Sequence, residues 1–181
     1  MTQYIVFTAD VQTTQAAKLR NALTAASNAG SEIYLLISSG GGNVFEGLSI
    51  GAFMKTLPVA ITTHNIGQID SIANLIFSAG TKRYANQNSS FLFHGVSMHY
   101  EKQDFIESQL EDQWRGVKRM RENITAAISA YSGLSIIDVE TLMVSGTTIL
   151  SAPEALAKAI IHEVRNAAIP PGSQVIAIGN V

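Results

Sequence analysis

The stretch that decides the fold reads EIYLLISSGGG and covers residues 32–42. Its central run, from Ile33 to Ile37, is apolar or aromatic throughout, which is typical of a strand buried on both faces of a parallel sheet. Three glycines follow at once, and a helix is predicted from there to about Thr56, closed by Pro58. The pattern therefore predicts a strand, a glycine turn and a crossover helix, which is the unit from which α/β folds are built.

Further strands and helices alternate on both sides of this unit. Strands are predicted at residues 4–8, 59–65, 83–84, 90–94 and 160–164, and residues 175–178 are expected to pair at a sheet edge. Helices are predicted to start with caps at Thr13 or Thr14, at Ser71, at Ser135 and at Ser151. This alternation predicts one α/β domain with a largely parallel sheet, whose ligands bind in the loops after the strands.

The composition changes after residue 100. Eleven charged residues lie between Glu101 and Glu122. Apolar residues continue through the segment at spacings of three to five, namely Phe105, Leu110, Trp114, Val117, Met120, Ile124 and Ile128. This periodicity predicts an amphipathic helix over about Asp104 to Tyr131, roughly 40 Å long at 1.5 Å per residue. Its apolar stripe packs either on the core of its own domain or on another subunit, and both interpretations stay open.

Composition narrows the class of protein. The chain has 181 residues, 46% of them hydrophobic, and a formal net charge of -2, which excludes a disordered chain and disfavours a nucleic-acid-binding module. It has no cysteine, and no apolar run approaches the roughly 18 residues of a membrane span. Because the N-terminus lacks the pattern of a signal peptide, we expect a soluble cytoplasmic protein with neither nucleic acid nor membrane as a partner.

The segment most suited to chemistry reads GQIDSIA, residues 67–73. We expect the strand to end here, a tight glycine turn to follow, and Ser71 to begin an apolar helix. The Ser71 hydroxyl is explained either as a helix N-cap or as a nucleophile at a helix N-terminus. A serine nucleophile needs a base. His94, which ends the run Phe91 to Phe93, is the candidate base, and a half-buried structural histidine is the alternative.

The glycines Gly40, Gly41 and Gly42 also have two interpretations. They form either a plain strand-to-helix turn or a loop whose backbone supplies an oxyanion amide or an edge for an extended peptide. The sequence lacks the signatures of a phosphate loop, a dinucleotide site, a zincin helix and an α/β-hydrolase elbow. Since the spacing of His94 and His99 does not favour metal binding, we predict neither a metal nor an organic cofactor.

Four segments, in this order, resemble the proteolytic subunit of the Clp protease, a family of serine peptidases with a crotonase-like fold. They are residues 33–42, 66–73, 88–94 and 150–155, and the resemblance covers about residues 4–165. It implies an α/β fold of repeated β-β-α units with a largely parallel sheet and a projecting long "handle" helix. It also implies a single domain over residues 1–181, with a head at about 1–100 and 145–181 and a handle region at about 101–144.

The same resemblance implies a mechanism without a cofactor. Ser71 takes the position of the nucleophile, His94 that of the general base, and Gly42 and Ile72 those of the oxyanion amides. Extended peptide or unfolded protein lies along the glycine edge formed by Gly40 and its neighbours. The family assembles as a double heptamer, joined through the handles, that encloses the active sites.

One position of the family's catalytic triad differs. The family's catalytic aspartate falls on Thr147, which accepts a hydrogen bond but brings no negative charge. Removing that charge costs about four powers of ten in rate in a serine-protease triad. The site is then a serine–histidine dyad, takes a carboxylate from elsewhere, or is inactive. Asp138 and Glu140 are the nearest upstream acids, and Asp70, beside the serine, is expected to point away.

Two further departures concern the surroundings of the site. His94 is followed by Gly95-Val96 where the family has Gln-Pro. The chain begins almost at the first predicted strand, so we do not expect the axial segment through which the family meets an ATPase unfoldase.

Three functions therefore stay open. The first is a serine-type endopeptidase in an oligomeric ring chamber. The second is a catalytically weak or inactive ring subunit with a scaffold or regulatory role, suggested by Thr147. The third and least favoured is a crotonase that acts on acyl-CoA thioesters through a similar oxyanion hole, with Lys82-Arg83 as a thin basic rim for the CoA phosphates.

Overall fold

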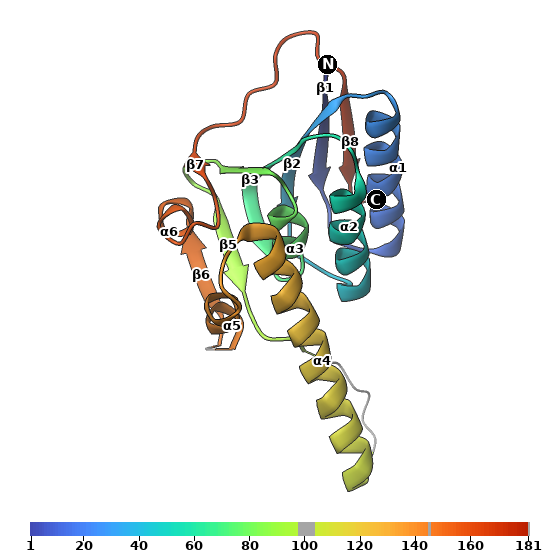
Figure 1. Ribbon diagram of the computed structural model, residues 1–181, viewed down its shortest axis with the longest axis vertical. Helices are drawn as coiled ribbons and strands as arrows, with labels where there is room; N and C mark the ends of the chain where they lie inside the picture. Colours follow the sequence, from blue (N-terminus) through green and yellow to red (C-terminus); the bar gives the residue numbers. More distant parts are fainter. Residues whose placement is uncertain (98–103, 145, 181) are drawn as a thin grey trace.

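The computed structural model describes residues 1–97, 104–144 and 146–180. The strands are β1 (Thr2–Thr8), β2 (Glu32–Ser39), β3 (Ile61–Asp70), β4 (Lys82–Ala85), β5 (Ser90–Phe93), β6 (Thr148–Ser151), β7 (Glu163–Val164) and β8 (Val175–Gly179). The helices are α1 (Thr13–Asn28), α2 (Val44–Thr56), α3 (Ala73–Ser78), α4 (Glu107–Ser132), α5 (Ile136–Val144) and α6 (Ala152–Ala157). From β1 to α3, each strand is followed by one helix. Two successive strands, β4 and β5, then precede α4 (Figure 1).

The described strands form one 8-stranded sheet. Its main path runs β6-β5-β3-β2-β1-β8, and β4 pairs with β3 and β7 beside that path. The pairs are parallel except for β5 and β6, which are antiparallel. The largely parallel α/β sheet predicted from the sequence is thus confirmed, and so is the pairing of the C-terminal residues, since β8 lies at the edge next to β1.

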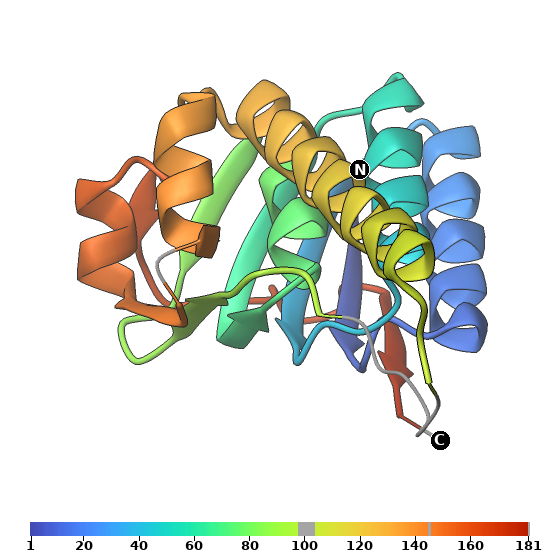
Figure 2. The same cartoon turned by 90° about the horizontal axis from the view of Figure 1, so that it is seen from below.

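Helices α1, α2, α3 and α4 lie side by side on one face of the sheet (Figure 2). The core lies beneath them, where Ile33 and Leu35 of β2 are almost completely buried. All six residues of α3 are buried, and its Phe77 packs edge-on against Phe91 of β5 with ring centroids 5.2 Å apart. An aromatic pair of this kind contributes about 0.5–1.5 kcal/mol beyond its buried area. This packing holds α3 against the strand that leads to His94.

Helix α4 extends well beyond the sheet (Figure 1). It begins at Glu107, slightly later than the predicted Asp104, and its buried residues lie only near its C-terminal half, at Ile124, Thr125 and Ile128. Trp114, nearer the start, is 61% exposed. The predicted apolar stripe therefore packs on the chain's own core at one end and is exposed at the other. None of the described helices combines the length and the apolar character needed to cross a membrane.

Of the four predicted helix caps, those at Ser135 and Ser151 are confirmed, and those at Thr13 or Thr14 and at Ser71 are wrong. The Ser135 hydroxyl accepts a hydrogen bond from the Asp138 amide, and Glu154 accepts hydrogen bonds from the amide and hydroxyl of Ser151. Helix α1 instead begins at Thr13 itself, after Gln12, and has no side-chain cap. The strand predicted at residues 160–164 is shorter than expected, because only its last two residues pair with β4. The predicted domain boundary near residue 100 falls outside the described residues.

Candidate active site

Ser71 lies in the turn between β3 and α3. The prediction of a glycine turn before it was wrong, because β3 continues through Gly67 to Asp70 and pairs there with β5. The backbone reverses at the serine itself, with a φ of 55°, which is uncommon for a residue other than glycine. Helix α3 begins at Ala73 and has no side-chain cap, so the interpretation of the Ser71 hydroxyl as a helix cap was also wrong.

Asn74 holds this turn in place. Its side chain is 1% exposed, and its Nδ2 donates hydrogen bonds to the carbonyl oxygens of Leu92 at 2.8 Å and of Ser71 at 3.1 Å. The Ser71 amide donates to the same Leu92 carbonyl at 2.8 Å. The serine turn is thus tied to the strand that leads into His94. The sequence analysis missed Asn74, and the available signal was one amide side chain inside an otherwise apolar helical segment.

The glycine loop approaches the serine turn closely. Gly41 and Gly42 have φ values of 89° and 138°, in the region that favours glycine. A Cβ atom at Gly41 would lie 2.8 Å from both the Asp70 carbonyl oxygen and the Ser71 Cβ. The loop is anchored by the Val11 amide, which donates to the Gly41 carbonyl at 2.7 Å. A side chain at position 41 would therefore force the loop and the serine apart.

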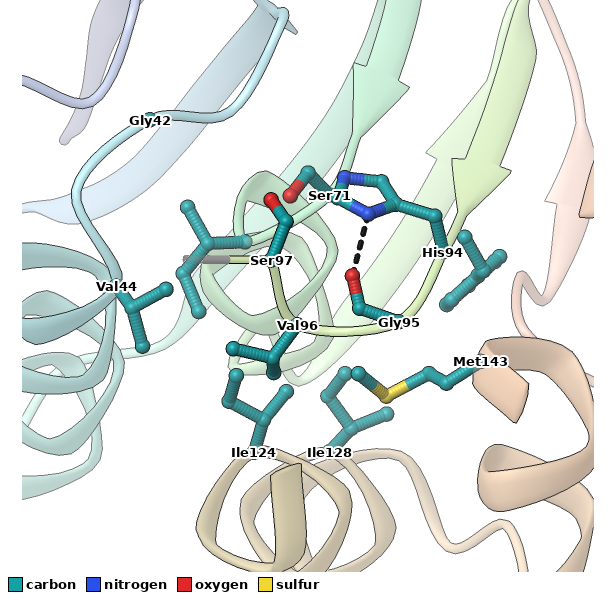
Figure 3. A pocket seen from close by; sticks show the side chains of 12 residues that line it. Gly42, Val44, Ser71, His94, Gly95, Val96, Ser97, Ile124, Ile128 and Met143 are labelled. Carbon is teal, nitrogen blue, oxygen red and sulfur yellow. Dashed lines mark hydrogen bonds between the residues drawn. The ribbon is translucent and has the colours of Figure 1, made fainter. Parts of the chain in front are cut away.

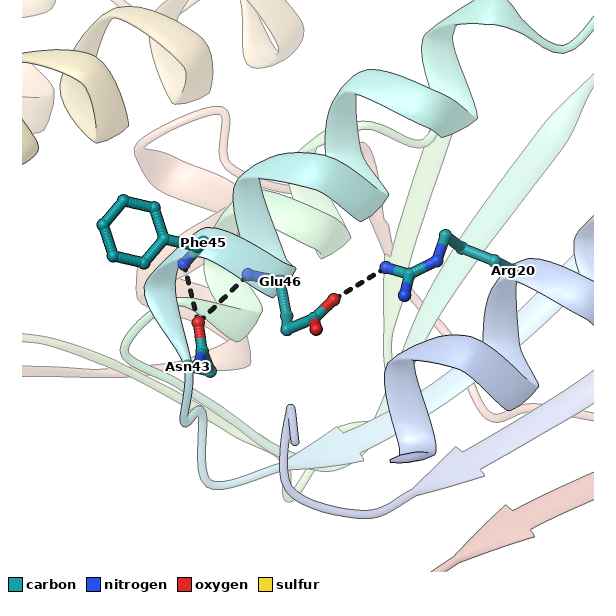
Figure 4. Close-up of polar contacts among 4 residues, drawn as sticks. All are labelled: Arg20, Asn43, Phe45 and Glu46. Carbon is teal, nitrogen blue, oxygen red and sulfur yellow. Dashed lines mark hydrogen bonds and ion pairs between the residues drawn. The ribbon is translucent and has the colours of Figure 1, made fainter. Parts of the chain in front are cut away.

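The start of α2 is fixed directly after this loop. The Asn43 Oδ1 accepts hydrogen bonds from the amides of Phe45 at 2.9 Å and of Glu46 at 3.2 Å (Figure 4). Arg20 of α1 forms an ion pair with Glu46 at 2.8 Å, and this hydrogen bond lowers the pKa of the Glu46 carboxyl. The cap and the ion pair leave little freedom to the backbone around Gly42.

A pocket of about 90 Å³ brings most of the predicted residues together (Figure 3). Its lining includes Gly42, Ser71, Ile72, His94 and Ser97. Apolar side chains of α4 and α5 complete the wall, among them those of Ile124, Ile128 and Met143. The pocket thus unites the glycine loop, the serine turn after β3 and the end of β5 with its following segment, which lie far apart in the sequence. Gly40, Gly41 and Thr147 do not line this pocket.

Two backbone amides at the pocket have no hydrogen-bond acceptor. Within residues 1–97, 104–144 and 146–180, neither the Gly42 amide nor the Ile72 amide donates a hydrogen bond. Ile72 is 2% exposed, so an acceptor for its amide must come from inside the pocket. Paired free amides of this kind stabilise an oxyanion, and each donor is worth about 3 kcal/mol in the transition state.

The His94 ring is held by the neighbouring peptide group. Its Nδ1 lies 2.6 Å from the Gly95 carbonyl oxygen, and because a carbonyl oxygen only accepts, Nδ1 carries the hydrogen. Nε2 is then the basic nitrogen, and Figure 3 shows it on the side of Ser71. In the part of the chain described, no hydrogen bond joins Ser71 to His94. Catalytic hydrogen bonds are often long in unliganded enzymes and tighten when substrate binds.

Thr147 directly precedes β6, as His94 directly follows β5. The described β5–β6 ladder ends where Phe93 pairs with Thr148, so His94 and Thr147 flank the end of the ladder. The two residues line a second, more open hollow of about 340 Å³. The Gly95 carbonyl accepts the Nδ1 hydrogen of His94, and among the described residues no hydrogen bond joins Thr147 to the imidazole.

The acids near the site differ in their surroundings. Asp138 begins α5, where its carboxylate accepts a hydrogen bond from Ser135, and is therefore engaged in a helix cap. Asp70 was expected to point away from the site, and no hydrogen bond of the described residues joins its carboxylate to Ser71 or His94; its Oδ1 is buried. Burial raises the pKa of the Asp70 carboxyl, and the interaction with His94 opposes this shift.

The structure holds no evident metal site in its described part, where no group of three or more histidines and acids comes together. His99 lies outside the described residues.

Arg83 does not form the basic rim that an acyl-CoA enzyme needs, because this side chain is 4% exposed. Its guanidinium donates instead to the carbonyl oxygens of Ile160 at 2.8 Å and of Ser132 at 3.1 Å. Arg83 therefore links β4 to the C-terminal part of the fold.

Comparison with known proteins places these observations in a family. The Clp protease family matches residues 1–168. A relative from Leifsonia xyli subsp. xyli (strain CTCB07), the ATP-dependent Clp protease proteolytic subunit 1, is 39% identical over 74 residues, which cover 40% of this chain and 38% of the relative. The aligned part thus spans less than half of that relative's length. The mostly parallel α/β sheet agrees with the crotonase-like fold of the family. From its match over nearly the whole sequence, we conclude that the chain belongs to the Clp protease family.

Proposed function

We propose that the chain is a serine-type endopeptidase in which Ser71 is the nucleophile and His94 the general base. One observation carries the proposal, namely the pocket in which the Ser71 side chain and the His94 ring meet two amides that lack acceptors. The bond from His94 Nδ1 to the Gly95 carbonyl supports it further, because it leaves the basic nitrogen on the side of the serine.

In the first half of the reaction, Ser71 Oγ attacks the carbonyl carbon of a peptide bond while His94 Nε2 takes its proton. The carbonyl oxygen becomes an oxyanion and accepts hydrogen bonds from the amides of Gly42 and Ile72. The carbon–nitrogen bond then breaks, and His94 gives its proton to the leaving amine. In the second half, His94 takes a proton from water, which attacks the acyl group and releases Ser71.

The proposed substrate is an extended peptide or an unfolded protein segment. Gly40 and Gly41 would offer it a backbone edge, since the loop carries no side chains there and lies beside the serine turn. Ring assembly, as a double heptamer around an inner chamber, belongs to the same proposal. The exposed half of α4, with Leu110 and Trp114, supports it because apolar side chains in such positions are usually covered. The proposal does not require an ATPase partner.

The second candidate is a ring subunit with little or no activity. Two observations favour it: Thr147 brings no charge to His94, and Ser71 and His94 are not hydrogen-bonded in the described structure. An acyl-CoA enzyme is disfavoured, because Arg83 is buried among carbonyl oxygens and is not exposed for a phosphate.

Labelling with a fluorophosphonate separates these functions. The reagent phosphonylates an activated serine, forming an oxygen–phosphorus bond and releasing fluoride. We expect wild-type protein to gain one label per chain, Ser71→Ala to gain none, and His94→Ala to be slower by orders of magnitude. Ser97→Ala is the matched control, because its hydroxyl lines the same pocket. Turnover of short fluorogenic peptides should follow the same order, and wild-type protein that neither labels nor cleaves would support the inactive subunit.

A further inference from the structure

We infer that the carboxylate of Asp70 supplies the negative charge that stabilises protonated His94, in the role that Thr147 cannot fill. The inference rests on the proposed function, since it concerns how His94 acts as a base. Asp70 acts through the imidazole and does not touch the substrate, so it is a positioning residue.

The register of the sheet brings the two residues to neighbouring positions in the fold. Asp70, the last residue of β3, pairs with Leu92 of the parallel strand β5, two residues before His94. His94 directly follows β5, which ends at Phe93, and Ser71 directly follows Asp70, so both groups flank the serine turn.

The carboxylate is poised for a cation. Asp70 Oδ1 is buried and, among the described residues, has no hydrogen-bond donor. A buried charged oxygen without a partner is costly, and an opposite charge nearby reduces that cost. Among the described residues, His94 is the one charged group whose interaction with Asp70 shifts the pKa of this carboxyl. Burial raises that pKa, and His94 lowers it.

This arrangement stabilises the transition state more than the resting enzyme. A general base takes up a proton only in its neutral form, and with neutral His94 the buried Asp70 Oδ1 lacks a partner among the described residues. When the imidazole takes the proton of Ser71, an ion pair forms, so the interaction is stronger at the moment of reaction. The Gly95 carbonyl cannot do this, because it orients the ring without bringing a full charge.

The test compares Asp70→Asn with Glu140→Gln, which removes a half-buried acid from helix α5. Fluorophosphonate labelling is measured from pH 5 to 9 in each protein, and urea unfolding is measured beside it to separate a lost charge from a lost fold. Without the negative neighbour, the protonated imidazole loses the opposite charge that stabilises it in the transition state. We expect Asp70→Asn to label roughly tenfold more slowly at its plateau, with a free energy of unfolding close to that of wild type. Glu140→Gln should match wild type.

The inference and the proposed function fail separately. If wild type labels at Ser71 and Asp70→Asn has the same rate and profile, the inference is overturned and the peptidase proposal stands. If wild type does not label, the peptidase proposal falls, and the inference that rests on it falls with it. Asp70→Glu, which keeps the charge, provides a second variant should the amide variant fail to fold. It should label at close to the wild-type rate, and a fall equal to that expected for Asp70→Asn would overturn the inference.

Discussion

His94 Nδ1 donates to the carbonyl oxygen of Gly95, the next residue in the chain, over 2.6 Å. A local backbone contact thus selects the tautomer that a serine peptidase selects with an aspartate. The contact depends on the path of the chain immediately after β5, where Gly95 and Val96 follow the histidine. Orientation of the base and supply of negative charge, which a triad aspartate combines, are separated in this protein.

Thr147→Asp should speed up fluorophosphonate labelling. Thr147 and His94 flank the end of the β5–β6 ladder and line the same hollow, so a carboxylate at position 147 adds a negative charge near the imidazole. Two unit charges 4 Å apart interact by about 1–4 kcal/mol between water and a protein surface, which corresponds to a gain of roughly fivefold or more. Thr147→Asn is the control for size, and equal rates in the two variants would show that position 147 does not reach the imidazole. Thr147→Asp should also restore much of the rate lost in Asp70→Asn.

Gly47→Ala should destabilise the protein and the serine turn. A Cβ atom at Gly47 of α2 would lie 2.3 Å from the Cγ1 atom of Ile72. The backbone amide of Ile72 is, among the described residues, one of the two amides without an acceptor at the pocket. Overpacking of this kind costs about 1–3 kcal/mol, and we expect this loss in urea unfolding together with slower labelling. Gly116→Ala on α4 is the control, because no atom lies within 4 Å of its Cβ position. This control should gain about 0.5–1 kcal/mol from helix propensity, and equal effects at the two sites would contradict the packing argument.

Asn74→Ala should cost about 1–3 kcal/mol of unfolding free energy. The variant removes the side-chain hydrogen bonds to the carbonyl oxygens of Ser71 and Leu92, each worth about 0.5–1.5 kcal/mol, while both oxygens keep a backbone donor. Because Asn74 ties the serine turn to β5, labelling of the folded fraction should slow as well. Denaturant titration measures the first effect and labelling at low urea the second. Loss of stability with an unchanged labelling rate would show that the turn keeps its geometry without Asn74.

The free energy of unfolding should fall as the pH drops below about 6.5. Burial lowers the pKa of His64 and of His162 in the folded chain. The His162 Nδ1 accepts a hydrogen bond from the Arg83 amide, which requires an unprotonated nitrogen. The unfolded chain therefore binds protons first, so the stability is present above the unfolded pKa of about 6.5 and is lost as the pH falls. Urea titrations between pH 5.5 and 8 check this, and a flat or opposite trend would contradict it.

The parts of the fold set by local sequence were predictable. The apolar run Ile33 to Ile37, the glycines after it, and the caps at Ser135 and Ser151 each depend on near neighbours. The parts set by distant partners were not. β3 continues to Asp70 because β5, some twenty residues later, provides hydrogen bonds, and no local pattern shows this.

The candidate site divides in the same way. Ser71 and His94 were chosen from short motifs, and the fold brings them to one pocket. The positions of Asn74, Asp70 and Arg83 depend on burial against segments remote in sequence, and burial reversed the expectation for Arg83. Side-chain type indicated that these residues are polar, but not which partners they meet.

A crystal structure of the fluorophosphonate-treated protein tests the central claim most directly. The account predicts phosphorus bonded to Ser71 Oγ and a phosphoryl oxygen about 2.7–3.1 Å from the amide nitrogens of Gly42 and Ile72. It also predicts His94 Nε2 turned toward the serine oxygen while Nδ1 keeps the Gly95 carbonyl. An adduct on Ser97, or a phosphoryl oxygen directed to solvent with both amides unpaired, would contradict it.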